Sequence, residues 1–255
     1  MSHLILFSRL IPLVFWVVLG FLALFLISPF KFVKLKKKII SYWSKTLLAL
    51  FRLRVICKNT ESKVVPPYPF VLVANHISWI DIFVLLSMFP VSFIAKIEIK
   101  KWFFLGSLVG MAGTVFIDRN RRKSIREVSK KMIQGSADRN NSYAFFPEGK
   151  TSNGKTIQKF HSGLFSLLFE NQELKLLPVL IKYKKDYSFT EACAYVDDMT
   201  LIESVIKIIK TPNLLAEVEI LPVNIVDRCE NQLPSANRKY LAAKARTRML
   251  EAYHR

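Results

Sequence analysis

The chain has 255 residues, and its 38 Lys and Arg residues against 19 Asp and Glu residues give it a net charge of +19. This length suits one α/β domain with a membrane anchor, and the positive charge favours a nucleic acid or an anionic membrane as partner. The three cysteines, Cys57, Cys193 and Cys229, are scattered without CxxC spacing. They indicate reduced thiols, and they exclude a disulfide framework and a structural zinc site.

The N-terminal segment contains an almost unbroken apolar run from Leu10 to Ser28. About 20 apolar residues in a helix cross the hydrocarbon core of a bilayer, so this run is just long enough. A cleaved signal peptide fits less well, because the run is too long and no small-x-small site follows it. Nine basic residues and no acidic residue lie between Lys31 and Lys58. Since this basic block directly follows the apolar run, we expect an anionic lipid surface as the partner.

The mode of attachment stays open between a span and an insertion into one leaflet. Positive charge stays on the cytoplasmic side of a membrane, so the cluster Lys31–Lys38 predicts that the rest of the chain is cytoplasmic. The segment Ile39–Arg54 reads as a basic amphipathic helix, with apolar residues at helical spacing at Ile40, Trp43, Leu47, Leu48 and Phe51. A basic amphipathic helix beside an apolar helix also suits monotopic insertion.

From residue 53 onward, apolar runs typical of strands alternate with helix-like stretches. The expected strands are Arg54–Cys57, Phe70–Ala74, Val91–Ala95, Thr114–Ile117, Tyr143–Phe146, Leu176–Tyr183, Ala192–Val196 and Ala216–Leu221. The expected helices are Trp79–Met88, Lys101–Met111, Arg122–Gln134, Ser162–Glu170, Leu201–Ile209 and a last helix from Ser235 through Tyr253. This alternation predicts an α/β fold with a mixed, largely parallel sheet covered by helices. We expect residues 1–52 to form the membrane anchor and residues 53–255 the α/β domain.

The segment VANHISWIDI places His76 at a strand end and Asp81 in the first turn of the following helix. A neutral imidazole takes a proton from a hydroxyl when a carboxylate holds its other nitrogen. This arrangement is the His/Asp half of a catalytic triad, and the sequence has no GxSxG serine. The substrate would therefore supply the nucleophile as an alcohol. Taken alone, a His near an Asp is more often a structural pair or a helix cap.

Two further segments carry residues suited to substrate binding. The segment YAFFPEGKTS runs from a strand into a Pro-Glu-Gly turn, where Glu148 could accept hydrogen bonds from a polyol or order the site. Gly149 in this turn would let a ligand approach the backbone closely. The segment GTVFIDRNRR places Arg119 after a strand, and Arg forms bidentate bonds to phosphate. For Arg121, Arg122 and Lys123 a solvated basic face is the simpler interpretation.

These segments, in this order and spacing, resemble the glycerolipid acyltransferase family typified by bacterial 1-acyl-sn-glycerol-3-phosphate acyltransferases. NHISWID is similar to its NHxSxxD block, GTVFIDR to its GxxFIDR block and FPEGKTS to its FPEGTxS block. The stretch from Lys159 to Gly163 and the stretch Leu177-Pro178-Val179 resemble two later blocks. The resemblance covers roughly residues 50–225, and together the blocks make a chance match very improbable.

The resemblance implies a role for each matching position. His76 corresponds to the general base and Asp81 to the acid that orients it. Acceptor-binding positions are implied for Gly113, Phe116 and Arg119 in one block and for Glu148, Gly149 and Ser152 in the other. Pro178 matches a position linked to the acyl donor. Lys150 departs from the family, which usually has Thr there, and this puts the local contact to the headgroup in doubt.

The implied function is transfer of a fatty acyl group from acyl-CoA or acyl-carrier protein to the sn-2 hydroxyl of 1-acylglycerol-3-phosphate, which gives phosphatidic acid. An alternative acceptor is a lyso-ornithine lipid or another lysophospholipid. The reaction needs no bound cofactor and no metal. The expected partners are the lysolipid acceptor, the anionic inner leaflet of a bacterial inner membrane and a donor that includes acyl-carrier protein as one option. His3, His161 and His254 have no carboxylate arrangement like that of His76, so we interpret them as bystanders.

Two other classes of function are weaker. A membrane-tethered nucleic-acid-binding protein would need a glycine-aromatic RNA-binding signature or a zinc pattern, and the sequence has neither. A scaffold of the same fold without activity would be expected to have lost His76 or Asp81, and both are present.

Overall fold

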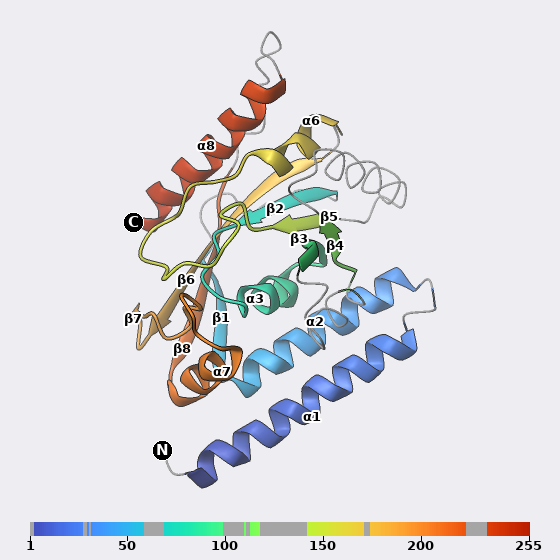
Figure 1. Ribbon diagram of the computed structural model, residues 1–255, viewed down its shortest axis with the longest axis vertical. Coiled ribbons are helices and arrows are strands. Elements are labelled where there is room, and N and C mark those ends of the chain that lie inside the picture. The colour runs from blue at the N-terminus through green and yellow to red at the C-terminus, as the bar shows by residue number, and fades with distance from the viewer. Residues whose placement is uncertain are drawn as a thin grey trace.

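A helical hairpin and a helix-covered sheet make up this computed structural model (Figure 1). It describes residues 3–27, 30, 32–58, 69–98, 110, 113–117, 142–170, 174–222 and 234–255. The hairpin consists of α1 (His3–Ile27) and α2 (Val33–Leu50), which run antiparallel along one side of the domain. The hairpin lies against the sheet-containing part of the chain mainly through α2.

The sheet is mixed and largely parallel, as the alternation of strands and helices predicts. Its strands are β1 (Leu53–Lys58), β2 (Phe70–Ala74), β3 (Val91–Lys96), β4 (Val115–Ile117), β5 (Ser142–Phe145), β6 (Lys175–Lys185), β7 (Ser188–Phe189) and β8 (Leu214–Ile220). The order is β1-β8-β6-β2-β5-β3-β4, with β7 paired to β6. The strands from β6 to β4 in this order are parallel, whereas β8 is antiparallel to β6. The carboxyl ends of β2, β3, β4 and β5 therefore meet at one edge of the sheet.

Helices cover both faces of the sheet and enclose two apolar cores. One core joins α2, α3 (Asp81–Met88) and α7 (Leu201–Lys210) to the sheet. The other core joins α8 (Pro234–Tyr253) and the short helices η2 (Gly163–Ser166) and α6 (Leu167–Glu170) to the opposite face. Strand β2 is buried along its whole length between the two cores, as expected for a central parallel strand.

The two helices of the hairpin are locked together by a reciprocal pair of tryptophans. The indole Nε1 of Trp16 donates to the backbone oxygen of Trp43 at 3.2 Å, and Nε1 of Trp43 donates to the backbone oxygen of Trp16 at 2.9 Å. The opposite face of α1 is apolar and exposed at Ile11, Val14, Phe15, Val18, Leu19, Leu22, Phe25 and Leu26. The segment Ser8–Ile27 is long and apolar enough to cross a membrane. This uncovered apolar face is consistent with membrane association.

Four expectations from the sequence need correction or lie outside the described residues. Ala192–Val196 is a turn and loop instead of a strand. This short apolar run contributes buried side chains to the core around α3 without pairing with a strand, and periodicity cannot distinguish the two cases. The amphipathic helix ends at Leu50 instead of Arg54, because Arg52 adopts a left-handed conformation with φ 53° before β1. The expected helix at 122–134, and all but Gly110 of the one at 101–111, lie outside the described residues.

Candidate active site

His76 and Asp81 form a direct side-chain pair at the carboxyl end of β2. The Nδ1 atom of His76 lies 2.8 Å from Oδ2 of Asp81, and the two side chains are 17% and 0% exposed. The loop after β2 presents the imidazole, and the first residue of α3 presents the carboxylate. The strand–turn–helix junction thus brings together two side chains five residues apart.

The Asp81 carboxylate is surrounded by hydrogen-bond donors. Its Oδ2 atom accepts the backbone N–H groups of Ile77 at 2.7 Å and Ser78 at 2.8 Å. Its Oδ1 atom accepts the phenolic O–H of Tyr183 at 2.6 Å. Because these three contacts require Asp81 to act as an acceptor, the remaining contact assigns the Nδ1 proton to His76. The Nε2 atom of His76 then carries the lone pair and can act as a base.

The plane of the His76 ring is fixed by an aromatic stack. The imidazole lies on the ring of Phe146, with 3.8 Å between ring centroids and 4° between planes. Phe146 in turn stacks on Phe93 of β3, with 5.5 Å between centroids. Among the described residues, Nε2 of His76 has no hydrogen-bond partner, so it is available to a substrate hydroxyl. The base is therefore held in position by both the carboxylate and the stack.

The loop after β5 holds the backbone of His76 on both sides. The backbone N–H of His76 donates to Oε1 of Glu148 at 2.8 Å. The backbone oxygen of His76 accepts from the backbone nitrogen of Ser152 at 2.9 Å and from its Oγ at 3.1 Å. The loop around Tyr195 adds a brace, because its backbone nitrogen donates to the backbone oxygen of Ile77 at 3.0 Å. The HxxxxD and FPEG segments thus form one structural unit.

Glu148 is buried, and its carboxylate is occupied by the backbone. It is 3% exposed, and its Oε2 atom accepts the backbone N–H of Gln158 at 3.1 Å. Burial raises the pKa of Glu148 to about 7, and the two backbone N–H donors from His76 and Gln158 oppose that shift. Arg246 of α8 fixes the same loop by donating to the backbone oxygens of Ile157 and Gln158. This geometry suits a role in ordering the site, and a substrate contact by Glu148 stays a prediction.

A polar cavity of about 500 Å³ opens at the carboxyl edge of the parallel strands, and His76 itself does not line it. Its lining includes Phe146, which stacks on His76, together with Gly149, Lys96, Glu98 and His161. Gly149 has φ +75°, a backbone conformation that favours glycine, so its backbone can face the cavity. Ligands of parallel α/β sheets bind at this edge. The cavity is therefore a candidate ligand site.

The remaining predicted positions are spread around this edge. Phe116 lies on β4 beside the cavity-lining Ile117, and Gly113 precedes that strand with φ +89°. Pro178 lies on β6 in register with Val73 of β2, one strand away from the cavity-forming strands. Arg119 lies outside the described residues, as do Arg121, Arg122 and Lys123. Lys150 is exposed in the turn after Gly149. Roles in substrate binding stay predictions for these positions.

Sequence reasoning missed four residues that shape the site: Tyr183, Phe146, Arg246 and Lys96. Tyr183 is 102 residues from Asp81 and reads as an ordinary strand residue. Phe146 reads as the end of an apolar strand, and Arg246 as one of many basic residues of α8. Lys96 is the one with a usable signal, since it ends a parallel strand at the edge where sites form.

Comparison with known proteins gives a family to this fold and site. The Acyltransferase family model matches residues 55–182, half of the chain, including the His76–Asp81 pair and the Glu148 loop. The chain therefore belongs to the acyltransferase family. The structure is similar to the crystal structure of the 1-acyl-sn-glycerophosphate (LPA) acyltransferase from Thermotoga maritima, at a TM-score of 0.61 and 20% identity over 97% of this chain and 98% of that one. This likeness shows the fold.

The relatives in sequence fall into two groups. The 1-acyl-sn-glycerol-3-phosphate acyltransferase of Neisseria gonorrhoeae is 33% identical over 166 residues, which is 65% of this chain and 64% of that protein. The lyso-ornithine lipid O-acyltransferase of Brucella abortus is 33% identical over 189 residues, 68% of each chain. The one from Pseudomonas aeruginosa is 29% identical over 201 residues, 77% of this chain and 74% of that protein. The match to the Neisseria protein spans less than two thirds of that protein's length.

Proposed function

We propose that this chain transfers a fatty acyl group from acyl-CoA or acyl-carrier protein to the free hydroxyl of a lysolipid, with His76 as the general base. The observation that carries the proposal is the 2.8 Å contact between His76 and the buried, fully hydrogen-bonded Asp81. A base needs one nitrogen held and the other free in a partly exposed position, and the ring of His76 meets both conditions. The membership of the acyltransferase family supports the same reaction.

The reaction proceeds by direct transfer. Nε2 of His76 takes the proton of the acceptor hydroxyl as the oxygen attacks the thioester carbonyl carbon. The carbon–sulfur bond breaks after the new carbon–oxygen bond forms, and the thiolate leaves with the proton returned by the imidazolium. Asp81 stabilises the imidazolium charge between these two steps. No acyl-enzyme forms, because the nucleophile belongs to the substrate.

The acceptor that we propose first is 1-acylglycerol-3-phosphate, which would give phosphatidic acid. Lys96 and His161 line the 500 Å³ cavity, so a phosphate there would meet cationic and hydrogen-bonding groups, a role for His161 that the sequence did not predict. Arg119 follows β4, whose last residue Ile117 lines the same cavity, and its segment is the one that resembles a phosphate-binding block. The Neisseria relative, named for this acceptor, supports the assignment.

A lyso-ornithine lipid is the second candidate acceptor. The carboxylate-bearing Glu98 lines the same cavity as Lys96, and such a pair suits a headgroup with one ammonium and one carboxylate. The Pseudomonas and Brucella relatives, named for this acceptor, match longer parts of the chain than the Neisseria relative does. The reaction and the base are the same in both cases.

The hairpin would place this chemistry at the cytoplasmic face of an inner membrane. The exposed apolar face of α1 supports attachment to lipid, and the lysines that open α2 support the cytoplasmic side. A lysolipid in that leaflet would then reach the cavity without leaving the membrane surface.

The test is acyl transfer from radiolabelled acyl-CoA, and in parallel from acyl-carrier protein, to lysophosphatidic acid and to lyso-ornithine lipid. Wild type and His76→Ala are compared after thermal melting has shown that both are folded. Labelled phosphatidic acid that is lost in the variant supports the first acceptor and the base together. Labelled ornithine lipid without labelled phosphatidic acid would support the second acceptor in place of the first. Full activity in His76→Ala would contradict the mechanism, and silence with every pair of substrates would contradict acyl transfer itself.

A further inference from the structure

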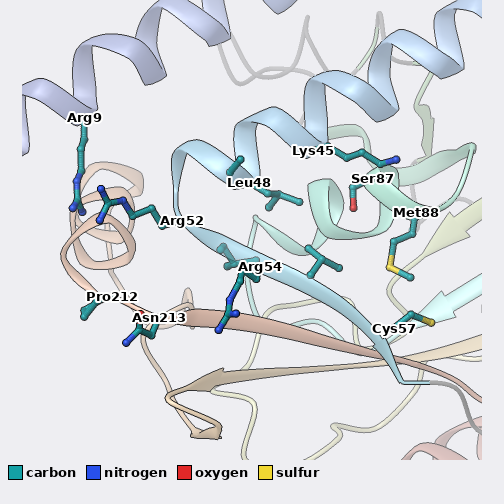
Figure 2. Close-up of a pocket in the computed structure, with 13 residues that line it drawn as sticks. Arg9, Lys45, Leu48, Arg52, Arg54, Cys57, Ser87, Met88, Pro212 and Asn213 are labelled. Carbon is teal, nitrogen blue, oxygen red and sulfur yellow. The ribbon is translucent and has the colours of Figure 1, made fainter.

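A large concave surface of the described residues lies away from His76. It has a volume of about 880 Å³ and opens between α2, the end of α3 and β1 (Figure 2). A second cavity of about 520 Å³ continues it along α2, because the two share Lys45 and Met88. We call the two together the α2 groove. None of its lining residues belongs to the loops that hold His76 or to the 500 Å³ cavity.

The α2 groove is lined by cations, and none of the described residues that line it is acidic. The cations come from several elements. Arg9, Lys45, Arg52 and Arg54 are labelled in Figure 2, and Lys34, Lys37 and Lys38 line the continuation of the groove along α2. Lys34, Lys38 and Lys45 are spaced by 4 and 7 residues, which is close to whole helical turns, so they form one row along α2. Like charges in a row repel one another, and an anion in the groove relieves that repulsion.

Three basic residues of the groove, Lys45, Arg52 and Arg54, are placed to meet a ligand. Lys45, Arg52 and Arg54 are exposed, and none of them forms an ion pair with another described residue. Some basic residues elsewhere are neutralised by ion pairs, for example Lys184 by Glu217 at 2.8 Å. Arg9 is held at the groove by a hydrogen bond from Nη1 to the backbone oxygen of Ile209 at 2.9 Å. A guanidinium has five N–H donors, and this bond uses one of them.

The groove also offers apolar surface, which distinguishes lipid from other anions. The partly exposed Val55 and Met88 line it between the cations, together with the buried Leu48 and Leu53. The row of cations on α2 is bordered by the exposed apolar residues of the same helix, Leu35 at 48% and Tyr42 at 67% exposure, and the exposed face of α1 continues that apolar surface. An acidic protein would match the charges and leave the apolar surface uncovered. A phospholipid satisfies both, since its phosphate meets the cations and its acyl chains meet the apolar residues.

We propose that the α2 groove binds an anionic phospholipid of the membrane, at a site separate from the catalytic one. The guanidinium groups of Arg9, Arg52 and Arg54 and the ammonium of Lys45 bind the phosphate, and the apolar lining takes the first part of an acyl chain. This inference rests on the membrane attachment in the proposed function and is independent of the acyl-transfer reaction. A bound lipid would hold the hairpin against the domain at the depth of the headgroups.

The experiment measures binding of dioctanoyl phosphatidylglycerol, with dioctanoyl phosphatidylcholine as the neutral probe, to the full chain in detergent micelles by titration calorimetry. The groove variant is Arg52→Gln/Arg54→Gln. The matched control is Lys239→Gln/Arg248→Gln, which removes the same charge from exposed positions of α8, on the opposite face of the sheet (Figure 1). All titrations are repeated in the His76→Ala background, where acyl transfer cannot contribute to the measured heat.

We expect saturable binding of phosphatidylglycerol that weakens at least tenfold in the groove variant and changes less than twofold in the control. Phosphatidylglycerol should bind equally well with and without His76. The lipid-binding proposal can therefore be supported even if no acyl transfer is detected. Equal weakening in both charge variants would overturn the proposal in favour of a general electrostatic attraction. Absence of saturable binding would also overturn it. So would a groove variant with normal lipid binding and weakened binding of acyl-carrier protein, because the groove would then serve an acidic protein.

Discussion

The phenol of Tyr183, near the carboxyl end of β6, donates a hydrogen bond of 2.6 Å to Oδ1 of Asp81 at the start of α3. The tyrosine is 1% exposed. Burial raises the pKa of Tyr183 well above its ordinary value, with the Asp81 charge as a further cause, so the phenol stays a donor at any working pH. Tyr183 thereby holds the far oxygen of the carboxylate that holds His76.

The Tyr183→Phe variant should lower kcat about tenfold and leave the KM for the acyl donor nearly unchanged. The reason is that Asp81 loses one of its donors and gains freedom to rotate, whereas no substrate contact is removed. Leaving one buried carboxylate oxygen without this donor should also cost about 1–3 kcal/mol of folding free energy. Steady-state kinetics and chemical denaturation measure the two effects. A rise in KM at constant kcat would show that Tyr183 acts on the substrate instead.

Asp81→Asn should remove charge while keeping the geometry. The introduced carbonyl can occupy the position of Oδ2 and accept from Ile77, Ser78 and His76, and the introduced amide can donate to the Tyr183 oxygen after the phenol turns. The imidazolium then lacks its counter-charge, so we expect kcat, measured by steady-state kinetics, to fall roughly 100-fold or more with the fold intact.

The double variant Asp81→Asn/Tyr183→Phe is the matched test of that geometry. It leaves the introduced side-chain amide without its acceptor, so Tyr183→Phe should cost stability in the Asp81→Asn background as it does in wild type, and the two losses should be roughly additive. No loss of stability on adding Tyr183→Phe to Asp81→Asn would contradict the proposed exchange of donor and acceptor between that amide and the phenol of Tyr183.

The raised pKa of Glu148 predicts that the stability of the fold depends on pH. Its folded pKa of about 7 is above the ordinary value of 4.5, with burial as the largest cause. The native state therefore keeps a proton that the unfolded state releases between these two values. The stabilisation from this group is complete below pH 4.5. It falls by at most ~3 kcal/mol as the pH rises to about 7, and it is constant above that pH.

The measurement is the free energy of unfolding of wild type minus that of Glu148→Gln across about pH 4 to 8, a range that brackets both pKa values. Subtraction removes the contribution of the other titrating groups, since Gln does not titrate. We expect the difference to decline over this range as the pH rises. A flat difference, or one that increases with pH, would mean that the carboxylate is charged and stabilised by the N–H groups of His76 and Gln158.

Gly20 predicts how tightly the hairpin is packed. A Cβ atom at Gly20 would overlap the indole ring of Trp43, which bonds to Trp16 across the same interface. Gly20→Val should therefore destabilise the hairpin by about 1–3 kcal/mol and lower its melting temperature. Leu19→Val introduces the same side chain at a position that is 41% exposed, and it should change the melting temperature much less.

The hairpin geometry also predicts the topology of membrane attachment. Arg9 near the start of α1 bonds to Ile209 at the end of α7, and Trp16 bonds to α2, so α1 lies along the domain. A helix held in this way inserts its outer face into one leaflet without crossing. Tags at the two ends of the chain should both be cleaved by protease added to the same side of sealed vesicles. Cleavage of only one tag would favour a span.

The sequence by itself determined the α/β class, the position of nearly every described strand and the pairing of His76 with Asp81. These features depend on local chemistry: buried parallel strands are continuous apolar runs, and two residues five apart at a strand–helix junction have few ways to meet. The apolar run Ala192–Val196 shows the limit, because whether such a run pairs as a strand depends on a neighbour that the run does not contain.

Only the tertiary structure decided what surrounds the base. The donors to Asp81 and Glu148 come from segments as far apart as Tyr183, Gln158 and His76, and the stack on His76 comes from Phe146. The groove cations Arg9 and Arg54 likewise meet only because α1 folds back along α2. Contacts between distant segments depend on how the elements pack, and no spacing along the chain encodes that packing.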